Sequence, residues 1–156
     1  MVKFQDFKDI LTLLKEKRAE FLVIGGHAVN FYSRMKLTED LDIWVNPTPE
    51  NAKIVFDVVN EFGYGSLDLS VEDFIKKDNV VQIGYKPIRI DFMTTIENMN
   101  FDDAYKKKRR GYLFGVNYVP YISFDDLVKN KRLAGRPKDK FDIWWLKKYQ
   151  KPKKIK

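Results

Sequence analysis

Two aspartates near residue 40 are the first side chains in this sequence whose types and spacing suggest chemistry. Asp40 and Asp42 lie two residues apart at the start of the apolar segment Leu41–Val45, which has the length and composition of a strand. Residues two apart in a strand point to the same face, and adjacent carboxylates repel each other unless a positive group lies between them. Carboxylate oxygens are suitable ligands for Mg²⁺, which often also contacts substrate phosphates. The pair therefore predicts a divalent cation site for Mg²⁺, or for Mn²⁺ in its place.

A third carboxylate lies within a later apolar segment. Ile88–Met93 alternates as a strand does, and Asp91 shares one face of it with Arg89. If this strand neighbours Leu41–Val45, three carboxylates converge. Such a set suits a two-metal site that clamps the attacking and leaving oxygens of a phosphoryl transfer.

Two adjacent glycines supply a different component. Gly25 and Gly26 follow the apolar run Phe21–Ile24 and precede a helical pattern over His27–Arg34. Glycines let backbone N–H groups approach a phosphate at the start of a helix, where the helix dipole also favours negative charge. The sequence therefore predicts a phosphate site beside the aspartates.

The elements that must position these residues predict a single α+β domain over residues 1–156, with a mixed β-sheet flanked by helices. We expect a core over about residues 20–122, a C-terminal helical part over about 123–150 packed alongside, and a basic tail over 147–156. Strands are predicted at 21–24, 41–45, 80–85, 88–93, 112–114 and 118–121, and helices at 4–17, 27–34, 49–62, 70–77, 100–108, 124–134 and 137–149.

These motifs together resemble the DNA polymerase beta-like nucleotidyltransferase superfamily. The pattern is an apolar strand that ends in Gly25-Gly26, then thirteen residues, then the Asp-x-Asp pair, and later an aspartate within a strand. The chain looks most similar to the small bacterial members, some of which belong to toxin–antitoxin or abortive-infection systems. The segment Phe124–Leu146 also resembles the end of those proteins. The resemblance covers roughly residues 20–146 and is strongest over 21–45.

This resemblance implies a role for each motif residue. Asp40 and Asp42 would bind the metals that hold a nucleoside triphosphate, and Asp91 would complete the second metal site and help to deprotonate the acceptor hydroxyl. Gly25 and Gly26 would hold the triphosphate. Many relatives have Gly-Ser at this turn.

The serine hydroxyl of those relatives is missing here, because His27 follows Gly26. His27 is therefore a candidate nucleotide contact, with a purely structural role as the alternative.

Lys131 is a further candidate nucleotide ligand. In the predicted helix from Phe124 it falls on the apolar face, four residues after Leu127. A lysine that points inward needs a partner, and a triphosphate would be one, whereas the alternative is a side chain that extends to water. Asp139 and Asp142, in the following helix, are interpreted as structural.

Composition bounds the remaining possibilities. The 156 residues include no cysteine and one histidine, which excludes disulfides, thiol nucleophiles and multi-histidine metal sites. The absence of a long apolar run predicts no membrane association and no signal peptide, and with it a cytoplasmic location. The net charge of +7 is uneven, because the chain from Lys129 onward holds 12 basic and 2 acidic residues. The run Lys106–Arg110 is also basic. These segments are either solvated or positioned to bind nucleic acid.

These observations predict a Mg²⁺-dependent nucleotidyltransferase that moves a nucleoside monophosphate from an NTP to a hydroxyl acceptor and releases pyrophosphate. The alternative is a catalytically inactive domain of the same fold that binds RNA or a protein partner. A toxin or toxin partner is a third reading, in which a tRNA or a protein would be the acceptor. Because little of the chain lies outside the predicted core, a partner chain or a homodimer is also expected.

Overall fold

A computed structural model describes residues 4–35, 37–64, 68–85 and 88–151 of the chain. Six strands form its centre: β1 (Phe21–Ile24), β2 (Leu41–Val45), β3 (Val80–Tyr85), β4 (Ile88–Met93), β5 (Arg109–Leu113) and β6 (Val116–Tyr121). Six α-helices surround them: α1 (Phe4–Glu16), α2 (Gly25–Tyr32), α3 (Pro49–Val59), α4 (Phe101–Lys106), α5 (Phe124–Ala134) and α6 (Pro137–Lys148). A π-helical turn, η1 (Asn60–Tyr64), extends α3, and η2 (Val71–Phe74) is a short 3₁₀ helix. The predicted α+β class is confirmed.

The strands form one mixed sheet in the order β3-β4-β2-β1-β6-β5. β1 and β2 are antiparallel, whereas β2 and β4 are parallel, as are β1 and β6. The two aspartate-bearing strands are thus neighbours, which is the condition that the sequence pattern sets for bringing their carboxylates together. Their register places Asp42 directly beside Asp91.

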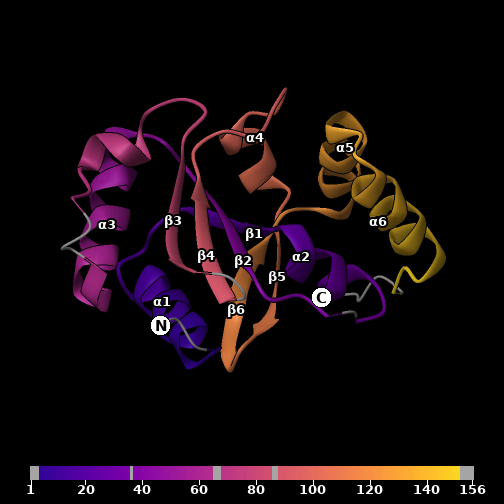
Figure 1. Cartoon of the computed structure of the whole chain (residues 1–156), viewed down its shortest axis with the longest axis horizontal. Coiled ribbons are helices and arrows are strands. Elements are labelled where there is room, and N and C mark those ends of the chain that lie inside the picture. The colour runs from indigo at the N-terminus through magenta and orange to yellow at the C-terminus, as the bar shows by residue number, and fades with distance from the viewer. Residues whose placement is uncertain (1–3, 36, 65–67, 86–87, 152–156) are drawn as a thin grey trace.

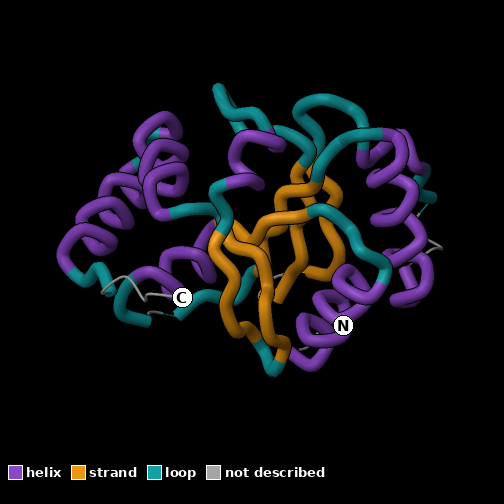
Figure 2. The backbone as a smooth tube through the Cα atoms, turned by 180° about the vertical axis from the view of Figure 1, so that it is seen from behind, coloured by secondary structure: helices purple, strands orange, loops and turns teal. Residues whose placement is uncertain are grey.

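The helices lie in two groups around the sheet. Helices α1 and α3 lie on one side, and α2, α5 and α6 lie on the other (Figure 1). The reverse view shows the same division, with the strands between the two helical groups (Figure 2). Each face of the central strands is therefore covered, which explains why every residue of Phe21–Ile24 is buried.

Local sequence signals explain most of the helix boundaries. The Thr48 side chain caps α3 by accepting a hydrogen bond from the Asn51 N–H, and Pro49 occupies the first turn. The Ser123 side chain caps α5 in the same way, and Gly135 ends it in the left-handed conformation. Helix α2 is an exception, because it begins at Gly25 rather than at the predicted His27 and ends at Tyr32.

The basic segments contribute to the fold more than the sequence indicates. Arg109 and Arg110 belong to β5, which begins three residues before the predicted strand. Lys107 forms an ion pair with Asp126 at 3.0 Å. In the tail, Lys151 donates its backbone N–H to the Tyr32 carbonyl at 2.9 Å. Residues 152–156 of the predicted tail lie outside the described residues. No helix in the described ranges is long and apolar enough to cross a bilayer.

A buried cluster of charges joins α5 to α6. The Lys131 ammonium lies 3.0 Å from Asp142 and 3.6 Å from Asp139, and both acids are almost completely buried. Arg136 also pairs with Asp139, at 2.7 Å. The interpretation of both acids as structural is thus supported, and the inward-pointing Lys131 has protein partners.

We expect Lys131→Met to lower the free energy of unfolding by about 3 kcal/mol, because it leaves two buried carboxylates without their shared cation. Urea denaturation at neutral pH would measure the loss. The control is Lys129→Met, which removes the same charge from the exposed face of the helix. A loss below about 1 kcal/mol would show that the cluster does not hold the two helices together.

Candidate active site

The turn between β1 and α2 lies directly beside the Asp-x-Asp pair. Ile24, the last residue of β1, pairs with Asp42 across the antiparallel strands. Gly25 follows with a φ of +67°, and a Cβ atom on it would lie 2.2 Å from the Asp42 carboxylate oxygen Oδ2. Glycine is therefore required here both by backbone conformation and by space. The close approach brings the glycine turn and Asp42 together.

The second glycine contacts the loop that leads to the aspartates. A Cβ atom on Gly26 would lie 2.5 Å from the Thr38 hydroxyl oxygen. Thr38 is two residues before Asp40, so this contact fixes the loop against the start of α2. Ile24, at the N-cap of α2, makes no side-chain capping hydrogen bond. Helix α2 therefore directs its positive dipole end toward the aspartates without a capping side chain at that position.

Asp42 is held in an unfavourable electrostatic environment. Burial is the main cause, followed by the charges of Asp91 and Asp40, and together they raise its pKa from 3.8 to about 6. Lys131 and Lys138 oppose this rise. Burial also raises the pKa of Asp91, against the attraction of Arg89. The three aspartates are close enough to influence one another, and a further positive charge among them would be stabilising.

Arg89 supplies part of that positive charge. Its Nη2 atom donates a hydrogen bond to Asp40 Oδ2 at 3.4 Å, and its Nε atom forms an ion pair with Asp91 Oδ1 at 2.9 Å. One guanidinium thus joins two of the three carboxylates. The sequence placed Arg89 on the same face as Asp91 without giving it a role. Because Arg89 lies two residues before Asp91 in a strand, the sequence could have indicated that the two side chains form an ion pair.

The donor set suits a divalent cation, because it consists of carboxylates whose mutual repulsion raises the pKa of Asp42. The side chains are not already gathered, however: in the described part of the chain, no group of three acidic or histidine side chains is arranged to hold a metal ion. The contact of Arg89 with both Asp40 and Asp91 explains this arrangement physically. A cation that binds all three carboxylates must compete with the guanidinium.

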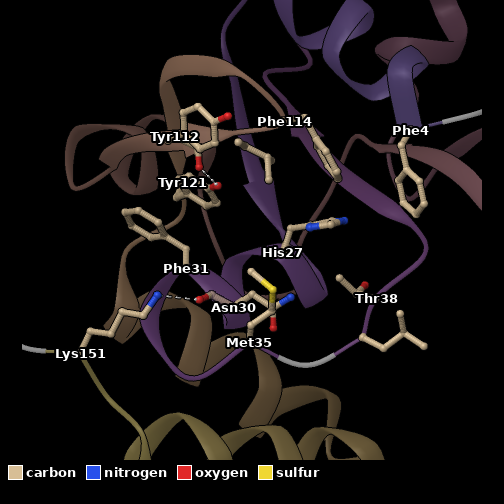
Figure 3. Close-up of a pocket in the computed structure, with 12 residues that line it drawn as sticks. Phe4, His27, Asn30, Phe31, Met35, Thr38, Tyr112, Phe114, Tyr121 and Lys151 are labelled. Carbon is tan, nitrogen blue, oxygen red and sulfur yellow. Dashed lines mark hydrogen bonds between the residues drawn. The ribbon is translucent and has the colours of Figure 1, made fainter.

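His27 lies among aromatic rings. Its ring contacts Phe7 and Phe114 with centroid distances of 6.3 and 5.1 Å. Figure 3 shows the imidazole beside Phe114. Burial lowers its pKa to about 4, so the imidazole is neutral at neutral pH. Its contact with the nucleotide stays a prediction. A neutral ring would offer a triphosphate a hydrogen bond but no ion pair.

Other basic residues of the loop and the last helices have partners of their own. Arg34 stacks on the Tyr149 ring at 4.4 Å, and its carbonyl accepts a hydrogen bond from Trp145 Nε1 at 2.7 Å. Trp144, next to Trp145 in α6, is 49% exposed. From their place between the glycines and Asp40, Arg34 and Lys36 are further candidates for contact with phosphate or acceptor, and Lys36 lies outside the described residues. Lys131, although paired, is close enough to Asp42 to affect its pKa.

The raised pKa of Asp42 predicts that its ionised side chain lowers the free energy of unfolding. Above about pH 6 the folded protein carries the charged form against its environment, whereas the unfolded chain ionises freely above about pH 4. We expect Asp42→Asn to raise the free energy of unfolding by about 1–3 kcal/mol at pH 8 in a chelating buffer. The gain should fall as the pH is lowered through 6 toward 4, which denaturant titrations at several pH values would measure. Equal gains at pH 8 and pH 4 would contradict this explanation.

Competition between Arg89 and a cation predicts a second effect. We expect Arg89→Gln to tighten Mn²⁺ binding roughly tenfold without nucleotide, because a positive charge is removed from beside two ligands. Electron paramagnetic resonance of free Mn²⁺ would measure the affinity at pH 8. The matched control is Arg132→Gln, on the exposed side of α5, which changes the net charge equally. Unchanged or weaker binding in Arg89→Gln would show that the guanidinium does not compete with a cation.

Comparison with solved structures shows how this fold is shared. TM1012 from Thermotoga maritima, assigned as a nucleotidyltransferase, is 18% identical, with a TM-score of 0.59 over 95% of this chain and 96% of that one. ANT(2″)-Ia, solved with adenylyl-2″-tobramycin, is 14% identical, with a TM-score of 0.55 over 92% and 86%. The lincosamide antibiotic adenylyltransferase LnuA, solved with lincomycin, is 14% identical, with a TM-score of 0.53 over 94% and 97%. At these identities the likeness shows the fold.

Sequence comparison gives a more specific result. The Type II methyltransferase M.MpnI of Mycoplasma pneumoniae is 27% identical over 139 residues, and the match covers 88% of this chain and 42% of that protein. This chain thus spans less than half the length of that relative. Residues 3–156 match the family described as "Nucleotidyl transferase of unknown function (DUF2204)". The suspected nucleotidyltransferase superfamily is confirmed, and the chain belongs to this nucleotidyl transferase family.

Proposed function

We propose that this protein is a Mg²⁺-dependent nucleotidyltransferase, active also with Mn²⁺, that transfers a nucleoside monophosphate from an NTP to a hydroxyl acceptor. The observation that carries the proposal is the position of Asp42, which lies beside Asp91 on the neighbouring strand and against the glycine turn at the start of α2. Carboxylates that could bind metal and backbone N–H groups that could bind phosphate thus lie close together on the inner strands of the sheet. Membership of a nucleotidyl transferase family supports this reading.

Each part of the site has a role in the proposed reaction. Asp40, Asp42 and Asp91 would hold the metal ions, which when bound neutralise the phosphate oxygens and lower the barrier to displacement. The backbone N–H groups at Gly25 and Gly26 would hold the triphosphate at the open end of α2. Lys131, beside Asp42, would add positive charge near the phosphates if its pairing with Asp142 rearranges.

The chemical step is a displacement at the α-phosphorus. The acceptor hydroxyl oxygen forms a bond to phosphorus, and the bond between the α-phosphorus and the bridging oxygen to the β-phosphate breaks. Pyrophosphate leaves with that oxygen, and the hydroxyl proton passes to the Asp91 carboxylate. Burial, which raises the pKa of Asp91, makes this carboxylate a better proton acceptor than an exposed aspartate.

A second candidate function is an inactive domain that binds RNA or a protein through its basic segments. The strand residues Arg109 and Arg110 and the exposed Lys147 and Lys148 support it. Several neighbouring cations already serve the fold, however. Lys107 pairs with Asp126, and the Lys108 ammonium lies 3.9 Å from the centre of the Tyr105 ring. A role in a toxin–antitoxin pair, with a tRNA or protein acceptor, stays a prediction.

The proposed function predicts that α-labelled NTP is converted to pyrophosphate and a labelled product with Mg²⁺ or Mn²⁺. We expect Asp42→Asn and Asp91→Asn each to reduce this transfer by at least about a hundredfold, because each removes a metal ligand. The control is Glu39→Gln, which removes an exposed charge next to Asp40. Absence of both NTP binding and transfer in the wild-type protein, across small-molecule, tRNA and protein acceptors, would refute the proposal.

A further inference from the structure

A cavity of about 770 Å³ lies on the side of α2 that faces α1 and the β5-β6 hairpin (Figure 3). Its walls come from parts of the chain that are far apart in sequence: α1, α2, the loop before β2, both strands of the hairpin and the tail residue Lys151. Five aromatic side chains line it: Phe4, Phe31, Tyr112, Phe114 and Tyr121. The volume is sufficient for a small organic molecule of two or three rings.

The charge of the lining restricts what such a molecule can be. None of the described residues that line the cavity is an aspartate or a glutamate, and Lys151 is the only charged residue among them. Its ammonium already donates to the Asn30 carbonyl at 3.2 Å. A molecule with several positive charges would therefore find no counter-charge there. Flat, uncharged ring systems match the aromatic walls.

His27 lines the cavity and carries a buried polar atom that has no hydrogen-bond partner among the described residues. The side chain is 92% buried, and this atom is Nε2. In Figure 3 the imidazole extends among the lining side chains, between Phe114 and Thr38. A buried polar atom without a partner costs about 1–3 kcal/mol, and a bound molecule with a suitable polar atom would remove that cost. The neutral ring suits an uncharged partner.

The cavity lies next to the candidate active site, and His27 and Thr38 connect the two regions. His27 directly follows Gly26, and Thr38, which also lines the cavity, contacts Gly26 and lies two residues before Asp40. The charge of Asp40 is close enough to influence His27. A molecule in the cavity would therefore have one end near the glycine turn and the aspartates. This is where an acceptor hydroxyl must lie.

We propose that this cavity binds the acceptor, an uncharged small molecule with a flat ring system and a hydroxyl group, and that His27 hydrogen-bonds to a polar atom of it. The inference rests on the proposed nucleotidyl transfer and names the substrate class of that site. It selects a small molecule over tRNA or a protein, and a neutral one over a polycation. The bond changes are those of the displacement described above.

The single histidine of the chain allows a direct test. Indole-3-ethanol, a neutral bicyclic ring with a primary hydroxyl, would be titrated into protein labelled with ¹⁵N at histidine, in a chelating buffer without nucleotide. We expect a saturable shift of the His27 resonances. Tobramycin, a polycation, should produce none. Absence of a saturable shift with indole-3-ethanol, or a stronger response to tobramycin, would overturn the proposal.

Two tyrosine variants distinguish binding in the cavity from binding elsewhere on the protein surface. Tyr112 and Tyr118 lie in the same hairpin and are both 66% exposed, but only Tyr112 lines the cavity. We expect Tyr112→Ala to weaken indole-3-ethanol binding roughly five- to tenfold and Tyr118→Ala to change it less than twofold. Equal effects of the two variants would show that the probe binds elsewhere.

Competition with ATP distinguishes a cavity that binds the acceptor from one that binds the nucleobase. With Mg²⁺ present, ATP should bind together with indole-3-ethanol and leave its dissociation constant within about twofold. Competitive displacement by ATP would assign the cavity to the nucleobase and overturn the acceptor proposal. Because the probe titration needs neither metal nor transfer, probe binding without any transfer would refute only the catalytic function. Transfer without probe binding would refute only the cavity proposal.

Discussion

The repulsion between Asp42 and Asp91 is the constraint on which the rest of this structure depends. Adjacent parallel strands hold the two residues in register, so neither side chain can move to the other face of the sheet. Parallel neighbours require a long connection, and here α3, η1, η2 and β3 lie between β2 and β4 in the chain. About a quarter of the chain thus serves to bring one carboxylate beside another.

The fold holds its buried carboxylates in two different arrangements. Near the aspartates, Arg89 joins Asp40 to Asp91, but it leaves the raised pKa of Asp42 uncorrected. Between α5 and α6, by contrast, Lys131 pairs with two buried acids. The first arrangement remains open to an added cation, whereas the second is satisfied within the protein. Carboxylates with raised pKa values, such as Asp42, are typical of sites that bind a charged ligand.

The sequence predicted those parts of the site that depend on local pattern. The alternation of Ile88–Met93 placed Asp91 on a strand face, and the glycine pair marked the end of β1. What it could not predict depends on contacts between distant segments. Arg89 reaches Asp40 across 49 positions of sequence, and the partners of Lys131 lie on a separate helix. Helix α2 starts at Gly25, whose φ of +67° and lack of a side chain allow the close approach to Asp42, and this approach is a contact between separate segments.

Helix α2 separates two environments that the sequence alone does not distinguish. Its first turn faces carboxylates, while His27, Asn30 and Phe31, spaced three and four residues apart, face an aromatic cavity. A phosphoryl transfer needs both properties, since charge must be neutralised at the phosphate while the acceptor is oriented by contacts that exclude water. Because one short helix borders both regions, a molecule held by His27 would lie next to the phosphates without entering the charged site. In the proposed reaction, the position of α2 would therefore set which acceptor hydroxyl can reach the α-phosphorus.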